Sequence, residues 1–137
     1  MYPARRPHKP IVPPAEPTSL SPEAGTPLRI SQRLFDELID HLEQMRPNEG
    51  CGLIAFEDDD PVQVYPGTNI LHSPTRYRMD DAEVLEAVAD MDARGWWLGA
   101  IFHSHPTSPP VPSSTDLQEA NWPDALMVIV SFEDDEP

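Results

Sequence analysis

A short apolar run from Trp96 to Phe102 leads directly into the sequence His103-Ser104-His105. A run of this length and character is consistent with a buried strand, which delivers side chains to a site at its end. Alternate side chains of a strand share one face, so His103 and His105 point the same way, roughly 6.5 Å apart along the chain. Ser104 then points to the opposite face. We therefore predict a buried strand that ends in two imidazoles able to converge on one metal ion.

The segment that follows favours a fixed loop and a third metal ligand. Four prolines between Pro106 and Pro112 restrict the backbone, which lowers the entropy lost when the loop is held in one shape. The residues from Ser113 to Thr115 are candidates for a helix N-cap, and Asp116 would fall in the first helical turn. Two histidines and one aspartate match the ligand count of a catalytic zinc site, in which water takes the fourth position.

Length and charge restrict the class of protein. The 137 residues, 39% of them hydrophobic, suffice for one domain with tails and one modest core. The formal net charge of −15 would repel phosphate backbones, so we expect no nucleic acid partner. The same charge favours solubility, with an acidic surface for a basic partner as the alternative. No apolar signal region and no run of about 18 apolar residues is present, so we expect a cytoplasmic protein with no membrane partner.

The chain divides into a leader and one domain. Residues 1–27 hold eight of the 18 prolines and almost no large apolar side chain, so we expect a disordered leader. In the domain, residues 28–137, we predict a short strand over Leu28–Ile30 and an amphipathic helix that Ser31 caps and that ends near Arg46. His41 lies on the polar side of this helix, where we expect it to be solvated.

Further elements follow from the hydrophobic pattern. We predict a strand over 51–56, a hairpin partner over 62–65, a brief strand over 76–79, and a strand over 125–132. Asp80 and Glu83 resemble a capping box that opens a second helix, and this helix ends at Gly95. The expected order is helix, hairpin, helix, strand, short helix, strand.

A hydrolytic metal site also needs a general base. Zinc lowers the pKa of bound water to about 7, and a nearby carboxylate takes the proton and passes it to the leaving amine. Glu49 stands just before the strand that begins at Cys51, and Gly50 beside it allows backbones to approach closely. We therefore predict that Glu49 is this base.

Together these residues resemble a known family. The sequence His103-Ser104-His105-Pro106, six further residues, Ser113, two residues and Asp116 is similar to the signature H-x-H-P-x6-S-x2-D of the JAMM (MPN-plus) metalloproteases. The glutamate before a Cys-Gly-Leu strand matches the family as well. The resemblance covers approximately residues 28–132, and the segment 69–79 is similar to the stand-alone prokaryotic members.

This resemblance implies a role for each matching residue. His103, His105 and Asp116 would bind Zn2+, Glu49 would be the general acid/base, and Ser113 would hydrogen-bond the water or the developing oxyanion. The implied fold is of the α+β type, a mixed β-sheet flanked by helices in the MPN/JAMM-like, cytidine-deaminase-like architecture. The implied reaction is hydrolysis of a peptide or isopeptide bond after the C-terminal glycine of a ubiquitin-like or sulfur-carrier protein.

Three alternatives stay open. A non-catalytic MPN-type interaction domain would be expected to lack one of the five site residues, and none is missing. A nuclease-like or deaminase-like zinc enzyme is disfavoured by the charge and by the lack of a cysteine-rich ligand set. Cys51, the only cysteine, excludes an intrachain disulfide and invites a Cys/His nucleophile pair, but its place in an apolar strand favours a core residue.

Two expectations concern the surface. The chain ends soon after the strand at Phe132, so we expect either a truncated sequence or an oligomeric contact, as in a homo-oligomer, that covers this edge. Arg76 and Arg78 are candidates to grip a substrate carboxylate or backbone carbonyl, although pairing with the many local acids is the simpler interpretation.

Overall fold

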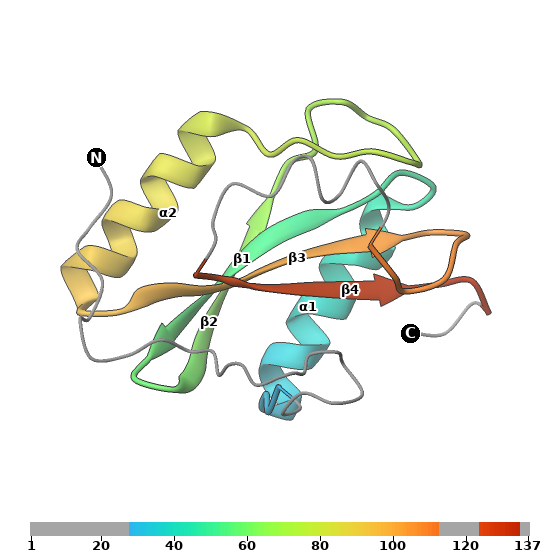
Figure 1. The fold of residues 1–137 in the computed structure, drawn as a ribbon. Helices are drawn as coiled ribbons and strands as arrows, with labels where there is room; N and C mark the ends of the chain where they lie inside the picture. Colours follow the sequence, from blue (N-terminus) through green and yellow to red (C-terminus); the bar gives the residue numbers. More distant parts are fainter. Residues whose placement is uncertain (1–27, 113–123, 135–137) are drawn as a thin grey trace.

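The fold is a four-stranded sheet with two helices, seen in a computed structural model that describes residues 28–112 and 124–134 (Figure 1). The strand order is β2-β1-β3-β4; β1 runs antiparallel to β2 and β3, and β4 runs parallel to β3. The predicted α+β class and mixed sheet are confirmed. In chain order the elements are α1 (Gln32–Met45), β1 (Cys51–Glu57), β2 (Asp60–Gly67), α2 (Asp81–Arg94), β3 (Trp97–His105) and β4 (Leu126–Ser131).

The two helices cover opposite faces of this sheet (Figure 1). Leu34, Leu38 and Leu42 of α1 are buried in a cluster with alternate residues of β1 such as Ile54. Met91 of α2 belongs to a second cluster, which takes the intervening residues of β1. The period of two along a strand sends successive side chains to different faces, so both faces of β1 are buried.

The two ends of α1 follow the sequence signals. Ser31 caps the helix, since its hydroxyl accepts a hydrogen bond from Leu34 N at 3.2 Å. The helix stops before Pro47, which cannot continue it. The strand predicted over Leu28–Ile30 is wrong: this segment has no regular structure, and its two apolar side chains pack against the α1 cluster. Leu28 and Ile30 are therefore partly buried without any strand pairing of their backbone.

His41 is not a solvated surface residue, so that prediction is wrong. Its Nε2 lies 3.0 Å from the carbonyl oxygen of Cys51 and 3.1 Å from that of Gly67. Both oxygens only accept, so Nε2 carries a proton and donates. Cys51 and Gly67 are register partners where β1 begins and β2 ends. His41 therefore ties α1 to the end of the β1–β2 hairpin that lies next to Glu49.

Helix α2 has the predicted ends but not the predicted capping box. Asp80 is the N-cap by backbone conformation, but its side chain makes no capping hydrogen bond. The carboxylate of Glu83 instead accepts from the backbone N and the Oγ1 of Thr68, each at 2.7 Å. Gly95 ends the helix with φ of 78°, a left-handed conformation that glycine adopts without strain. Neither described helix is long and apolar enough to cross a membrane.

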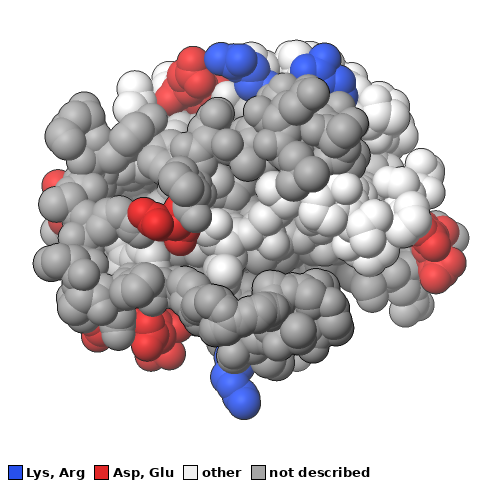
Figure 2. Space-filling view, viewed as in Figure 1, with Lys and Arg blue, Asp and Glu red and all other residues white. Residues whose placement is uncertain are grey.

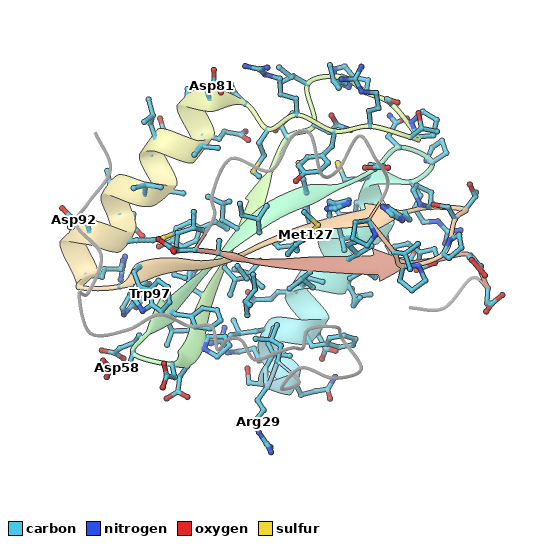
Figure 3. The ribbon with its side chains drawn as sticks, in the orientation of Figure 1. Arg29, Asp58, Asp81, Asp92, Trp97 and Met127 are labelled. Carbon is cyan, nitrogen blue, oxygen red and sulfur yellow. The ribbon has the colours of Figure 1, made fainter. Side chains whose placement is uncertain are left out.

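The first residue of β3 is anchored far from the histidines. Trp97 is buried, its ring packs on Phe56 with centroids 5.6 Å apart, and its Nε1 donates to the carbonyl of Asp58 at 2.9 Å. Figure 3 labels Trp97 and Asp58 beside the turn between β1 and β2. With this end fixed, the opposite end of β3 carries His103 and His105 to the other edge of the molecule.

Candidate active site

The two histidines at the end of β3 meet. His103 and His105 are 0% and 3% exposed, and their Nε2 atoms lie 3.2 Å apart. Their ring planes are inclined by 53°. Both side chains extend to one face of the sheet, as the alternation predicted. The sheet therefore delivers two imidazole nitrogens to one buried point.

The orientation of His105 is set by the proline-rich loop. Its Nδ1 lies 2.8 Å from the carbonyl oxygen of Pro109. A carbonyl only accepts, so Nδ1 is the donor in this hydrogen bond, and Nε2 is the ring nitrogen directed toward His103. Metal-binding histidines typically use their second nitrogen in this way, because the hydrogen bond fixes tautomer and ring direction.

The spacing of the two nitrogens fits a shared zinc ion. A tetrahedral ion with Zn–N bonds of about 2.0–2.1 Å has its ligand nitrogens roughly 3.3 Å from each other. The observed separation is 3.2 Å. Within residues 28–112 and 124–134, no group of three or more His, Cys, Asp or Glu side chains is arranged so that it could hold a metal ion. Asp116 and Ser113, the predicted third ligand and hydrogen-bond donor, lie outside these ranges, so their roles stay predictions.

Backbone pairing between β1 and β3 continues beyond the first residue of β1, toward Glu49. Cys51 and His103 are register partners, and the next residues along stay bonded, with Ser104 N donating to Gly50 O at 3.0 Å. Gly50 N donates in turn to the hydroxyl of Ser104 at 2.8 Å. Continued antiparallel pairing sets Glu49 opposite His105, and alternation gives it the face of the histidines. Glu49 is 3% exposed, so its carboxylate is buried at the end of the sheet where β3 carries the two histidines.

The segment between β2 and α2, residues 68–80, is held together by Asn69, which is 4% exposed. Its Nδ2 donates to the carbonyl oxygens of Glu49 and Arg76, each at 3.0 Å, and its Oδ1 accepts from the backbone N of Arg78 at 3.1 Å. The strand predicted over 76–79 is wrong, since only one isolated bridge, Asn69 to Met79, forms there. The Asn69 amide occupies the backbone groups that a strand partner would use.

Tyr77, which sequence reasoning missed, belongs to the site. Its ring stacks on the imidazole of His103, with centroids 4.6 Å apart and planes inclined by 23°. The pattern of the segment favoured a strand, and nothing in its spacing pointed to a distant histidine. The available signal was a large aromatic residue between two arginines in an otherwise polar stretch.

Cys51 is a core residue, as predicted. It is fully buried, and burial, followed by the nearby carboxylates of Glu83 and Glu49, raises the pKa of its thiol to about 12. A thiol that stays protonated at neutral pH is a poor nucleophile. The burial of Cys51 and the raised pKa of its thiol therefore disfavour the alternative in which Cys51 and a histidine form a nucleophile pair.

The arginines of the 68–80 segment lie on the surface. Arg78 lies 3.8 Å from Asp81, both exposed, a distance and a setting in which an ion pair contributes little to stability. Figure 2 shows basic side chains at the upper margin of the molecule with an acidic group beside them, and a further basic side chain at the lower margin. The pairing with local acids predicted for Arg78 is confirmed.

Comparison with known proteins gives the chain its context. The model of a family described as prokaryotic homologues of the JAB domain matches residues 31–136. The chain is 36% identical over 109 residues to the CysO-cysteine peptidase of Mycobacterium tuberculosis, which covers 78% of this chain and 75% of the relative. It is 37% identical over 99 residues to a probable TtuB-protein conjugate cleaving protease of Thermus thermophilus, covering 72% and 66%. A solution structure from Desulfitobacterium hafniense is similar over 75% of this chain and 73% of that one, with 37% identity and a TM-score of 0.68.

Proposed function

This chain belongs to the family of prokaryotic homologues of the JAB domain, and from that membership and the site geometry we propose that it is a zinc-dependent peptidase or isopeptidase. Relatives named as peptidases and conjugate-cleaving proteases support a hydrolase. The observation that carries the proposal is the pair of His103 and His105 Nε2 atoms 3.2 Å apart, with His105 oriented by the Pro109 carbonyl.

The residues proposed to hold the ion are His103 and His105, through Nε2, and Asp116. Two imidazoles and one carboxylate are a donor set that suits zinc and leaves a position open. Zinc in such a site supplies Lewis acidity, which brings the pKa of water to about 7 and polarises a carbonyl group.

Glu49 is proposed to move the proton. A buried carboxylate next to the attacking water takes its proton and passes it to the leaving amine. The backbone of Glu49 is held on both sides, because its N–H donates to Ser73 O at 2.8 Å and its carbonyl accepts from Asn69 Nδ2 at 3.0 Å. These two bonds hold the backbone of Glu49 in place. General acid/base catalysis requires a carboxylate that is held in position. Ser113 is proposed to donate to the developing oxyanion, on the basis of its spacing from the histidines.

The proposed substrate is the C-terminal tail of a small ubiquitin-like or sulfur-carrier protein, cut after its terminal glycine. The names of both relatives support this class, since one refers to CysO-cysteine and the other to TtuB-protein conjugates. A narrow tail that ends in glycine also suits a site whose two histidines are almost completely buried.

The test combines metal analysis with hydrolysis of carrier proteins fused through a Gly-Gly terminus to a reporter, with mass detection of the cut. The variants His103→Ala and Asp116→Ala are expected to lose zinc. Glu49→Gln is expected to keep zinc but to lose about 10²–10⁴-fold in turnover, the usual contribution of a general acid/base. Zinc retained by His103→Ala would contradict the ligand assignment, and near-wild-type turnover of Glu49→Gln would contradict the role of the base. A wild-type protein that binds carriers without cutting them would indicate an interaction domain.

A further inference from the structure

We propose that Tyr77 is a positioning residue for His103 and that Asn69 is the anchor that keeps Tyr77 in place, an inference that rests on the proposed function. Neither residue is a candidate ligand or base. Both lie in the 68–80 segment, which the ligand signature of the sequence does not include.

The first step is the contact between the two rings. The centroids of Tyr77 and His103 are 4.6 Å apart and the planes differ by only 23°, so the rings lie face to face. Turning the imidazole about its bond to Cβ would drive its edge into the tyrosine ring. The stack therefore favours the ring plane in which His103 Nε2 faces His105 Nε2 at 3.2 Å. The two histidines are thus oriented by different loops, His105 by a hydrogen bond to Pro109 and His103 by the ring of Tyr77.

The second step is the anchor. Asn69 bonds the residues on both sides of Tyr77, donating to Arg76 O at 3.0 Å and accepting from Arg78 N at 3.1 Å. The same Nδ2 donates to the carbonyl of Glu49 at 3.0 Å. The buried Asn69 amide thereby holds both the backbone on either side of Tyr77 and the backbone of Glu49, the predicted base. Only an amide has both the donors and the acceptor that this arrangement needs, so aspartate, of equal size, cannot replace it.

The expected consequence is weaker zinc binding when the stack is lost. Groups that orient a metal ligand without touching the metal typically contribute about 10–100-fold to metal affinity. Tyr77→Phe keeps a ring over His103, whereas Tyr77→Leu keeps apolar bulk and removes the flat face. We expect Tyr77→Leu to bind zinc at least about tenfold more weakly than Tyr77→Phe. Asn69→Asp and Asn69→Ala are expected to resemble Tyr77→Leu.

The experiment measures zinc affinity of the full chain by competition with a chromogenic chelator, for the wild type and these variants. Ser31→Ala, which weakens the α1 cap far from the site, is the control for a general loss of stability. The proton resonances of the His103 ring are recorded in metal-free protein, where an aromatic ring stacked over the imidazole shifts them upfield. We expect this shift in the wild type and in Tyr77→Phe and its loss in Tyr77→Leu.

Two failures are distinguishable. A wild type that binds no zinc would overturn the proposed function, and the His103 resonances of the metal-free protein would then decide the positioning role alone. Equal zinc affinities in Tyr77→Phe and Tyr77→Leu, or His103 resonances without an upfield shift in the wild type, would overturn the inference. Because the resonance measurement is made on the wild type, it does not depend on whether any variant folds.

Discussion

Replacing Ser104 with alanine isolates one hydrogen bond between the histidine strand and the segment that carries Glu49. The Ser104 hydroxyl accepts from Gly50 N at 2.8 Å, and Ser104 is 0% exposed. Alanine removes this acceptor, and water has no access to replace it. The backbone bond from Ser104 N to Gly50 O, at 3.0 Å, is untouched, so the strands stay paired.

The expected loss of stability arises because the backbone N–H of Gly50 is left buried without an acceptor. Leaving a buried N–H without an acceptor costs about 1–3 kcal/mol, and alanine recovers little of it by being more apolar. We therefore expect Ser104→Ala to lower the free energy of unfolding by about 2 kcal/mol, or Tm by roughly 5–12 °C in a domain of this size. Zinc affinity should change little, because the histidines point to the other face. Hydrolysis should fall, because Gly50 adjoins the predicted base.

Urea unfolding of the wild type and Ser104→Ala tests this expectation. Ser31→Ala is a matched control, since it also removes a serine hydroxyl that accepts from a backbone N–H, at 3.2 Å, but in α1. Loss of an N-cap costs about 1 kcal/mol, and we expect the control to leave hydrolysis unchanged at temperatures where it is folded. An unfolding free energy for Ser104→Ala within about 0.5 kcal/mol of the wild type, at an unchanged slope, would refute the reasoning about the buried donor.

Two further predictions use the shifted pKa values. Since burial raises the pKa of the Cys51 thiol to about 12, native protein should resist a thiol reagent at pH 8 and react once unfolded in urea, and fast labelling of the native state would contradict this. The hydrogen bond from Tyr65 to Asp90, at 2.5 Å, lowers the pKa of Asp90, with Arg94 as a lesser cause. A carboxylate with a lowered pKa contributes stability above its unfolded pKa of about 3.9, and that contribution is lost as pH falls through the folded value. Tyr65→Phe should therefore lose less stability between pH 6 and pH 3 than the wild type, as measured by urea unfolding at both pH values, and equal losses would show that the bond is not the cause.

The elements of the sheet could be predicted because their signals are local. The apolar run into His103 and the helix behind Ser31 each depend on a period of two or 3.6 residues and on a cap or a proline. Both were confirmed, with ends close to those expected. The meeting of His103 and His105 follows from the same alternation, which explains how one strand sufficed to predict it.

The contacts that the sequence does not predict share a different cause. His41, Asn69 and Glu83 all bond to backbone groups far along the chain, His41 to Cys51 and Gly67, Asn69 to Glu49, and Glu83 to Thr68. A backbone carbonyl or N–H is the same at every residue, so a sequence does not indicate which one a polar side chain will reach. The sequence therefore predicts solvation for His41 and a capping box for Glu83, and it indicates no bonding partner for Asn69.

The polar contacts that were missed are those that arrange the site. The ligand signature predicts which side chains gather, but both backbone groups of Glu49 bond to the 68–80 segment, at Ser73 and at Asn69. The same segment places Tyr77 on His103. A shift of this segment would therefore move the predicted base and one predicted ligand together, although it contains neither. The proposed catalytic unit is thus larger than the signature, since it includes the buried Asn69 amide that bonds both Glu49 and the residues beside Tyr77.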